Sequence, residues 1–332
     1  MRDRLDFIGT VTPQLLGPLT QMWSTHSSAA VAAATPTAMA GMTFVLSQFL
    51  DKCLFQLLRH GFRPGSLRKA PEALATLGPL VEKTEAMYAA VAAGSRAAAP
   101  SLHTLIKGLG RLLGSQPQVF GLPTPGRECT LLSTVLQLAL QVLSHGRTPT
   151  DSEDAPPGRP PLKDATPAMA LRLVHLPTTR LETLVATARR THEPEHRLDL
   201  EAQHESNMAS IRSVLTPENC TQLVWVLITQ FLPLDEGYLE EWMDEPERAV
   251  AEESRDELLE QGHGHAGDNS DAEDMSSRTA AMALLLALTT AFPEVAVPIR
   301  ANTPRSPPHF DAEAVPLTDC LCLQLEKGCR RS

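Results

Sequence analysis

The segment His192-Glu-Pro-Glu-His196 matches the H-E-x-x-H pattern of zinc hydrolases. That chemistry needs the segment to lie inside a helix, so that two imidazoles four residues apart face one Zn²⁺. Pro194 would remove a helical hydrogen bond and clash with the preceding turn, at a cost of about 3 kcal/mol. Ala202 stands where the longer form of the pattern has a third histidine ligand. The segment is therefore interpreted as a turn between two helices, and no metal site is predicted.

Other groups of residues that could form a metal, phosphate or catalytic site also lack a required member. Cys320, Cys322 and Cys329 provide three thiols but no fourth ligand, and the segment 262–265 (GHGH) lies in a polar stretch. No strand precedes the segment 108–110 (GLG), and the Lys-Ser/Thr ending of a phosphate-binding loop is missing. No spacing arranges serine, histidine and aspartate as a nucleophile relay. We therefore predict a protein that is not an enzyme and holds no cofactor.

The feature with the most functional weight is an acidic segment that spans residues 235–260. It holds twelve Asp and Glu residues against two Arg, a local charge of −10 that equals the net charge of the whole chain. The candidate partner-binding residues are Asp235, Glu236, Glu240, Glu241, Asp244 and Glu245. Carboxylates at 236, 240 and 244 fall on one side of a helix. Such a patch steers a basic protein towards it, less strongly as salt rises, although a solvated helix face explains the same pattern.

Two helices joined by a tight turn are predicted to position this segment. In the first helix Thr216 is the N-cap, and Pro217 occupies the first helical position, where its missing N–H costs nothing. The apolar positions that follow form one wide stripe: Leu223, Val224, Leu227, Ile228 and Phe231. Trp225 extends that surface, which predicts a helix covered on more than one side. Pro233 ends it, and a second, acidic helix completes a hairpin over residues 215–247.

The rest of the chain is also predicted to be helical. Aromatic residues make up only 4% of the 332 residues, and no run of alternating β-branched residues indicates a strand. Further helices are expected at residues 13–27, 37–60, 71–93 with a break or kink near Pro79, 101–114, 127–145, 166–176, 178–191, 195–214 and 279–291. Helices of this length joined by turns indicate an all-α fold, specifically an α-solenoid of HEAT-like antiparallel helix pairs.

Two polar stretches divide the predicted helical regions. Residues 148–161 contain five prolines and no large apolar side chain, a composition that cannot form a packed core. The expected organisation is helical repeats at 1–147, a disordered linker at 148–163, helical repeats with the acidic hairpin at 164–260, a disordered loop at 261–278, a helix at 279–292 and an irregular tail at 293–332.

Composition and charge argue against several classes of protein. Outside the acidic segment the charges sum to about zero, so the chain offers no basic stripe for nucleic acid. The first six residues are too charged for a signal peptide, and the longest apolar run, 280–292, is shorter than the ~20 residues that cross a bilayer. Six scattered cysteines are typical of a reducing compartment. We expect a soluble protein with no nucleic-acid partner and no membrane insertion.

The block 238–247 (YLEEWMDEPE) resembles a hairpin of the importin-beta (karyopherin) family, in particular its importin-11 type, with Glu245 where that family usually has Asp. The segment 53–62 (CLFQLLRHGF) is similar to a helix end upstream in the same proteins. The resemblance covers roughly residues 40–62 and 205–255 and fades after Ala291.

The resemblance implies a piece of a nuclear transport receptor that shuttles between nucleus and cytoplasm. It also implies three kinds of partner, namely a basic cargo protein, the Ran GTPase and the Phe-Gly repeats of nucleoporins. In that family the repeats that contact Ran lie before the matched region, and we expect this chain to lack them. The alternative interpretation is a stand-alone helical scaffold or adaptor that uses the same helix faces to bind other proteins.

Overall fold

The structure is a computed structural model, and it describes residues 2–35, 41–62, 67, 70–122, 129–145, 162, 165–190, 194–233, 243–244, 247 and 277–292. Within these residues the fold is all-α and no strand occurs, which confirms the predicted class. The linker at 148–163, apart from Leu162, and the tail from 293 lie outside the described residues, as do residues 261–276, so their predicted disorder is not tested. Residues 277–278, the last two of the predicted loop, are helical instead.

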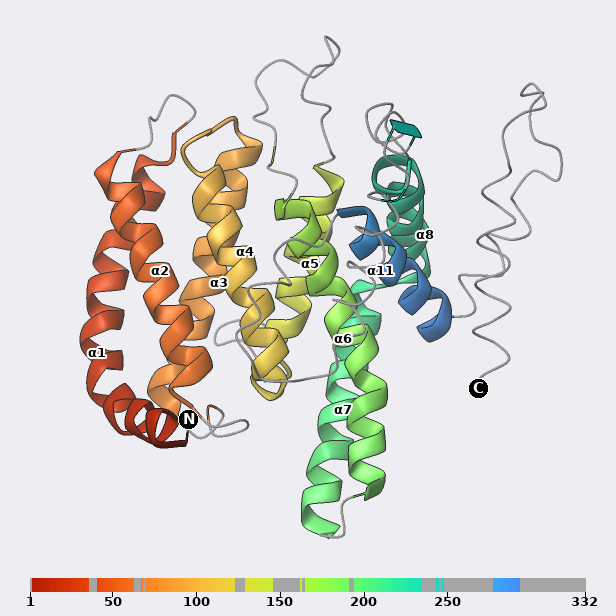
Figure 1. The fold of residues 1–332 in the computed structure, drawn as a ribbon, viewed down its shortest axis with the longest axis horizontal. Helices are drawn as coiled ribbons and strands as arrows, with labels where there is room; N and C mark the ends of the chain where they lie inside the picture. The colour runs from red at the N-terminus through yellow and green to blue at the C-terminus, as the bar shows by residue number, and fades with distance from the viewer. Residues whose placement is uncertain are drawn as a thin grey trace, which may run out of the picture.

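The helices follow one another along the chain with the labels used in Figure 1. They are α1 (Arg2–Ala33), α2 (Met42–His60), α3 (Pro71–Ala92), α4 (Ala99–Ser115), α5 (Leu131–Ser144), α6 (Ala165–Arg190), α7 (Pro194–Val214), α8 (Pro217–Val226) and α11 (Ser277–Ala291). A short 3₁₀ helix, η2 (Pro117–Val119), follows α4, and a π-helical turn, η3 (Leu227–Phe231), extends α8.

The helices pack in two layers. Helices α2, α4, α6 and α11 contact one another in that order, and α1, α3, α5 and α7 form a second series of neighbours (Figure 1). Contacts between the layers join α1 to α2, α3 to α4 and α5 to α6. Trp23 bonds to Asp51 and Thr12 lies against Gly61, so α1 and α2 run antiparallel. One continuous apolar core lies between the layers, rich in fully buried leucines such as Leu54, Leu80 and Leu105.

Prolines interrupt the helices less than the sequence predicts. Helix α6 passes through Pro177 and joins the two helices expected at 166–176 and 178–191, and α3 likewise passes through Pro79. Proline removes the N–H that would donate to the carbonyl of Leu173, four residues back, so α6 lacks one helical hydrogen bond here. The Thr178 and Thr179 hydroxyls donate to the carbonyl of His175 at 2.7 and 3.0 Å and do not replace that bond. Packing against α4, α5, α7 and α11 holds the helix together instead. The predicted break at Pro177 was therefore wrong.

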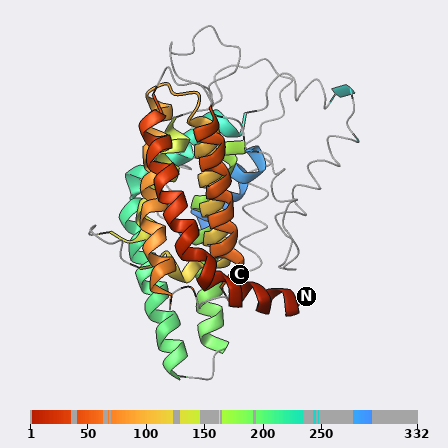
Figure 2. The same cartoon turned by 90° about the vertical axis from the view of Figure 1, so that its left-hand side faces the viewer.

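Helix α1 is also longer than predicted. It begins before the expected 13–27 segment, contains Pro13 and Pro18, and continues to Ala33 through residues expected to interrupt it. Its first turns point away from the two layers, whereas the rest of α1 lies beside α2 (Figure 2). Prolines inside a helix are the usual cause of such a bend. Helix α2 starts at Met42, later than the predicted 37.

One glycine of the segment 108–110 has a packing role. A Cβ atom on Gly108 would overlap the aromatic ring of Phe55, so glycine lets α4 approach α2 closely at this point. A Cβ atom on Gly110 would lie 3.7 Å from the nearest methyl carbon of Leu173 in α6, an ordinary contact distance, so packing does not require glycine there. None of the helices that the structure describes is both long and apolar enough to cross a membrane.

Candidate protein-interaction surface

Helix α8 begins as the sequence predicts. The Thr216 hydroxyl accepts a hydrogen bond from the backbone N–H of Asn219 at 3.3 Å, and Pro217 is the first helical residue. The side chain of Asn219 donates to the carbonyl of Val214 at 2.6 Å, which ties the new helix to the end of α7. The side of α8 and η3 that faces the core consists of Cys220, Leu223, Val224, Leu227 and Phe231, all buried. This cap and this apolar side fix the direction of the helix.

Trp225 faces solvent, contrary to the prediction of a helix covered on more than one side. Its side chain is 68% exposed, and Ile228, one turn further on, is also exposed. The reason is geometric. Trp225 lies one residue after Val224 and therefore roughly 100° further round the helix axis, outside the side that the core covers. We call Trp225 and Ile228 the Trp225 surface. A large aromatic ring left in water at a helix surface is typical of a binding anchor.

The backbone beneath the Trp225 surface is a π-helical turn. Leu232 N–H donates to the carbonyl of Leu227 at 3.0 Å, five residues back, and η3 covers Leu227–Phe231. The Thr229 hydroxyl donates to the carbonyl of Trp225 at 2.8 Å. Single π-helical turns occur frequently at functional sites. The turn therefore adds a second, independent reason to regard this end of α8 as functional.

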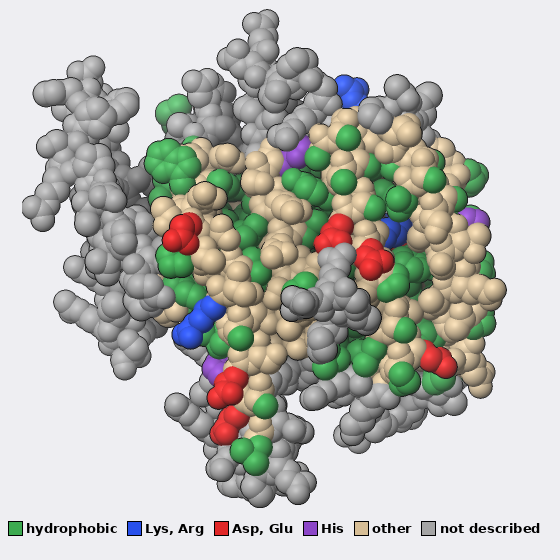
Figure 3. All heavy atoms as spheres, turned by 180° about the vertical axis from the view of Figure 1, so that it is seen from behind, with side chains coloured by type: hydrophobic (Ala, Val, Ile, Leu, Met, Phe, Trp, Pro, Cys, Tyr) green, Lys and Arg blue, Asp and Glu red, His purple; other side chains and the backbone are tan. Residues whose placement is uncertain are grey.

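The acidic segment follows this surface along the chain. Of its six candidate residues the structure describes Asp244, which is helical and exposed beside the exposed Met243. Asp235, Glu236, Glu240, Glu241 and Glu245 lie outside the described residues, so their predicted gathering on one helix side is not tested. Elsewhere the described acidic side chains are dispersed. On the face seen from behind they occur in ones and twos (Figure 3).

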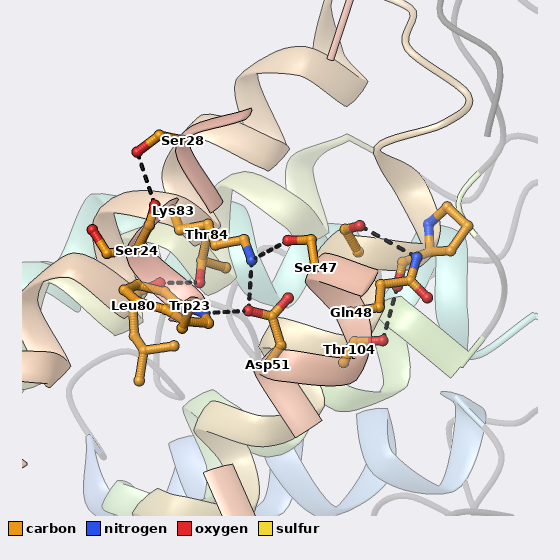
Figure 4. Close-up of polar contacts among 12 residues, drawn as sticks. Trp23, Ser24, Ser28, Ser47, Gln48, Asp51, Leu80, Lys83, Thr84 and Thr104 are labelled. Carbon is orange, nitrogen blue, oxygen red and sulfur yellow. Dashed lines mark hydrogen bonds and ion pairs between the residues drawn. The ribbon is translucent and has the colours of Figure 1, made fainter. Parts of the chain in front are cut away.

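A buried charged cluster joins α1, α2 and α3, and the sequence analysis missed it. The Lys83 ammonium lies 2.6 Å from Asp51 Oδ1 and 2.7 Å from Ser47 Oγ, and Trp23 Nε1 donates to the same Asp51 oxygen at 2.7 Å (Figure 4). The ammonium also lies 5.4 Å from the centre of the Trp23 ring. The signal in the sequence was Asp51 itself, a carboxylate on the apolar side of α2 that Leu54 and Leu58 share.

This cluster is closed to substrates. The Asp51 side chain is completely buried and that of Lys83 nearly so. Burial raises the pKa of the Asp51 carboxyl and lowers the pKa of the Lys83 ammonium, while each charge attracts the other and opposes the shift. A shallow cleft of about 410 Å³ between α1 and α3 is lined by Thr20, Gln21 and Glu72, among others, but not by either charged partner. The cluster therefore holds three helices together and offers no reactive group at a surface.

The segment 192–196 (HEPEH), which was rejected as a zinc site, was predicted to be a turn between two helices. Helix α6 ends at Arg190 and α7 begins at Pro194, so the proline of the motif is a first helical residue. Across the residues that the structure describes, no three His, Cys, Asp or Glu side chains form a group that could hold a metal ion. Cys320, Cys322 and Cys329 lie outside that part of the chain, as does the segment 262–265.

Comparison with known proteins adds no family to this description. No family model, no curated protein and no solved structure matches the chain.

Proposed function

We propose that this protein is a non-enzymatic, helical-repeat module that binds other proteins, with the Trp225 surface and the acidic segment together holding a basic segment of a partner. The neighbour pattern of the helices supports a solenoid of HEAT-like pairs. Such an array needs each helix to contact its counterpart in the next pair, as α1, α3, α5 and α7 do in one layer and α2, α4 and α6 do in the other.

The observation that carries the proposal is the exposure of Trp225 just before the acidic segment. Tryptophan is enriched among the few side chains that provide most of the energy of protein interfaces. Carboxylates in the segment that follows it along the chain would raise the association rate of a basic partner and select against acidic ones. An aromatic anchor followed by negative charge fits a segment that contains both apolar and basic residues.

Binding of a fluorescently labelled Lys/Arg-rich peptide with one leucine tests this proposal. Replacing Trp225 by alanine should weaken binding about tenfold or more, as for an interface hot spot. Reversing the charges of Glu236, Glu240 and Asp244 should also weaken binding, and this effect should shrink as salt rises from low to moderate concentration. The control is Leu198→Ala, which removes an exposed apolar side chain from α7. Unchanged affinity in both test variants would refute the proposal.

A second candidate function is nuclear protein import, which the similarity of the block 238–247 to the importin-beta family favours. In that case the partners would be a basic cargo protein, Ran-GTP and nucleoporin Phe-Gly repeats, and the protein would move between cytoplasm and nucleus. Pull-down with Ran-GTP and with immobilised Phe-Gly repeats separates the two candidates. Binding to either supports transport, whereas binding to the basic peptide alone supports the stand-alone adaptor.

A further inference from the structure

Helix α2 carries an exposed stripe that the core does not use. Met42, Val45 and Phe49 are 79%, 59% and 60% exposed, while the opposite side of the helix is buried through residues such as Leu50 and Leu54. The exposed positions continue with Lys52, Gln56 and the half-buried Arg59. We call these six residues the α2 stripe.

The spacing of the α2 stripe is that of a helix-docking surface. Its positions 42, 45, 49, 52, 56 and 59 alternate steps of three and four, the heptad spacing by which one helix packs against another. The sides of α2 next to the stripe are occupied. Gln48 Nε2 donates to Ser101 Oγ of α4 at 3.3 Å, and Asp51 accepts from Trp23 of α1. The stripe therefore faces outward between α1 and α4, where an additional helix would fit.

The charge along the stripe indicates what kind of helix would pack there. Its first half is apolar and its second half carries Lys52 and Arg59. Among the described side chains of α1, α2 and α4 the only carboxylate is Asp51, which is buried and bonded to Lys83. Among these described side chains, no carboxylate is therefore left at the surface beside the two cations. Acidic groups of an incoming partner would complement them.

We propose that the α2 stripe docks an amphipathic helix of a partner protein, with apolar side chains against Met42, Val45 and Phe49 and carboxylates beside Lys52 and Arg59. A second copy of this chain fits less well. Two α2 stripes meeting across a two-fold axis would bring apolar halves together but leave the cations without acidic partners. The proposal rests on the proposed role in protein binding, but it uses a different helix and a partner of opposite charge.

The test uses the full chain and two synthetic helical peptides of three heptads, both with leucine at the a and d positions. One peptide carries glutamate and the other lysine at the flanking positions. The glutamate peptide should bind the wild-type protein more tightly than the lysine peptide. Phe49→Ser should weaken its binding about tenfold or more. Lys52→Glu should lower the affinity for the glutamate peptide and raise the affinity for the lysine peptide. A substitution that only damaged the surface would lower both affinities.

The control variant is Met282→Ser, which removes an exposed apolar side chain from α11 and should leave affinity unchanged. Melting temperatures of all variants should match the wild type, because the substituted side chains are outside the core. Three results would overturn the proposal. The first is equal affinity for the two peptides or none for the glutamate peptide. The second is a wild-type dimer that Phe49→Ser converts to monomer. The third is Phe49-dependent binding to anionic lipid vesicles without peptide binding.

Because the basic peptide and the glutamate peptide are separate probes, the two proposals fail separately. If no variant of the Trp225 surface or the acidic segment loses basic-peptide binding while the glutamate peptide binds as expected, the proposal for the Trp225 surface is refuted and that for the α2 stripe stands. The opposite pair of results would remove the stripe alone.

Discussion

Replacing Lys83 by methionine is the most informative test of the core. In the native structure Lys83 provides both the nearest positive charge and a 2.6 Å hydrogen bond to Asp51, whose side chain is completely buried. Methionine keeps the length of the side chain and removes the charge. Asp51 then retains the hydrogen bond from Trp23 but has no cation, and its Oδ2 atom already has no hydrogen-bond partner.

The expected loss of unfolding free energy is about 3–5 kcal/mol, the usual cost of leaving a buried charge unpaired. Removing both charges with Asp51→Leu and Lys83→Met should cost less than Lys83→Met alone, because no ion then remains in the core. The double variant still leaves the Trp23 N–H without an acceptor, a penalty of about 1–3 kcal/mol. Lys52→Met, the same chemical change at an exposed position of α2, should alter stability by about 0.5 kcal/mol or less.

The pKa shift of Asp51 predicts how the loss of stability in Lys83→Met changes with pH. Burial already raises the pKa of Asp51, and loss of the attraction to Lys83 raises this pKa further. A carboxyl whose folded-state pKa lies above its unfolded value stabilises the fold at low pH, and this contribution is lost as pH rises towards the folded-state pKa. The deficit of Lys83→Met relative to the wild type should therefore be smaller at pH 5 than at pH 8.

Urea denaturation followed by circular dichroism measures both quantities. A deficit below about 1 kcal/mol at pH 8 would mean that Asp51 finds water or another partner and that the cluster is not a closed ion pair. A deficit that is equal at both pH values would contradict the assignment of the penalty to ionised Asp51. A double variant less stable than Lys83→Met would show that packing, not charge, dominates.

Two further predictions concern α6 and α4. Burial, with a smaller contribution from Arg172, lowers the pKa of His175 to about 4, so its contribution to stability is complete above pH 6.5 and is lost as pH falls towards 4. His175→Gln should flatten the urea-midpoint profile over this range, where the native histidine accounts for up to about 3 kcal/mol, and an unchanged slope would contradict the burial of the ring. Gly108→Ala should cost about 1–3 kcal/mol because its Cβ overlaps the Phe55 ring. Phe55→Leu in the same chain should recover part of that loss, and failure to do so in urea melts would refute the close approach of α2 and α4.

The caps and several helix bounds were predictable because they depend on neighbouring residues. Thr216 and Pro217 start α8 as their side chains dictate, and the expected 101–114 helix is α4 within two residues at each end. The errors arose where a distant or subtle contact overrides a local rule. Pro177 normally indicates a break, but the sequence pattern does not reveal that α6 packs against α4, α5, α7 and α11. Trp225 was placed on a second side of the helix, and its hydrophobicity led to the wrong prediction that this side is covered.

Charge was the least predictable property of the candidate surfaces. The net charge of −10 equals the charge of one segment, and this pattern favours a basic partner. Lys52 directly follows Asp51 in the sequence, and Arg59 lies about two helical turns further along. The structure shows that Asp51 is buried and paired with Lys83, so its charge does not reach the surface. The outer side of α2 is therefore basic. The core ion pair and the proposed docking stripe are thus linked, since burial of Asp51 on one side of α2 leaves this helix with two cations and no carboxylate on its outer side.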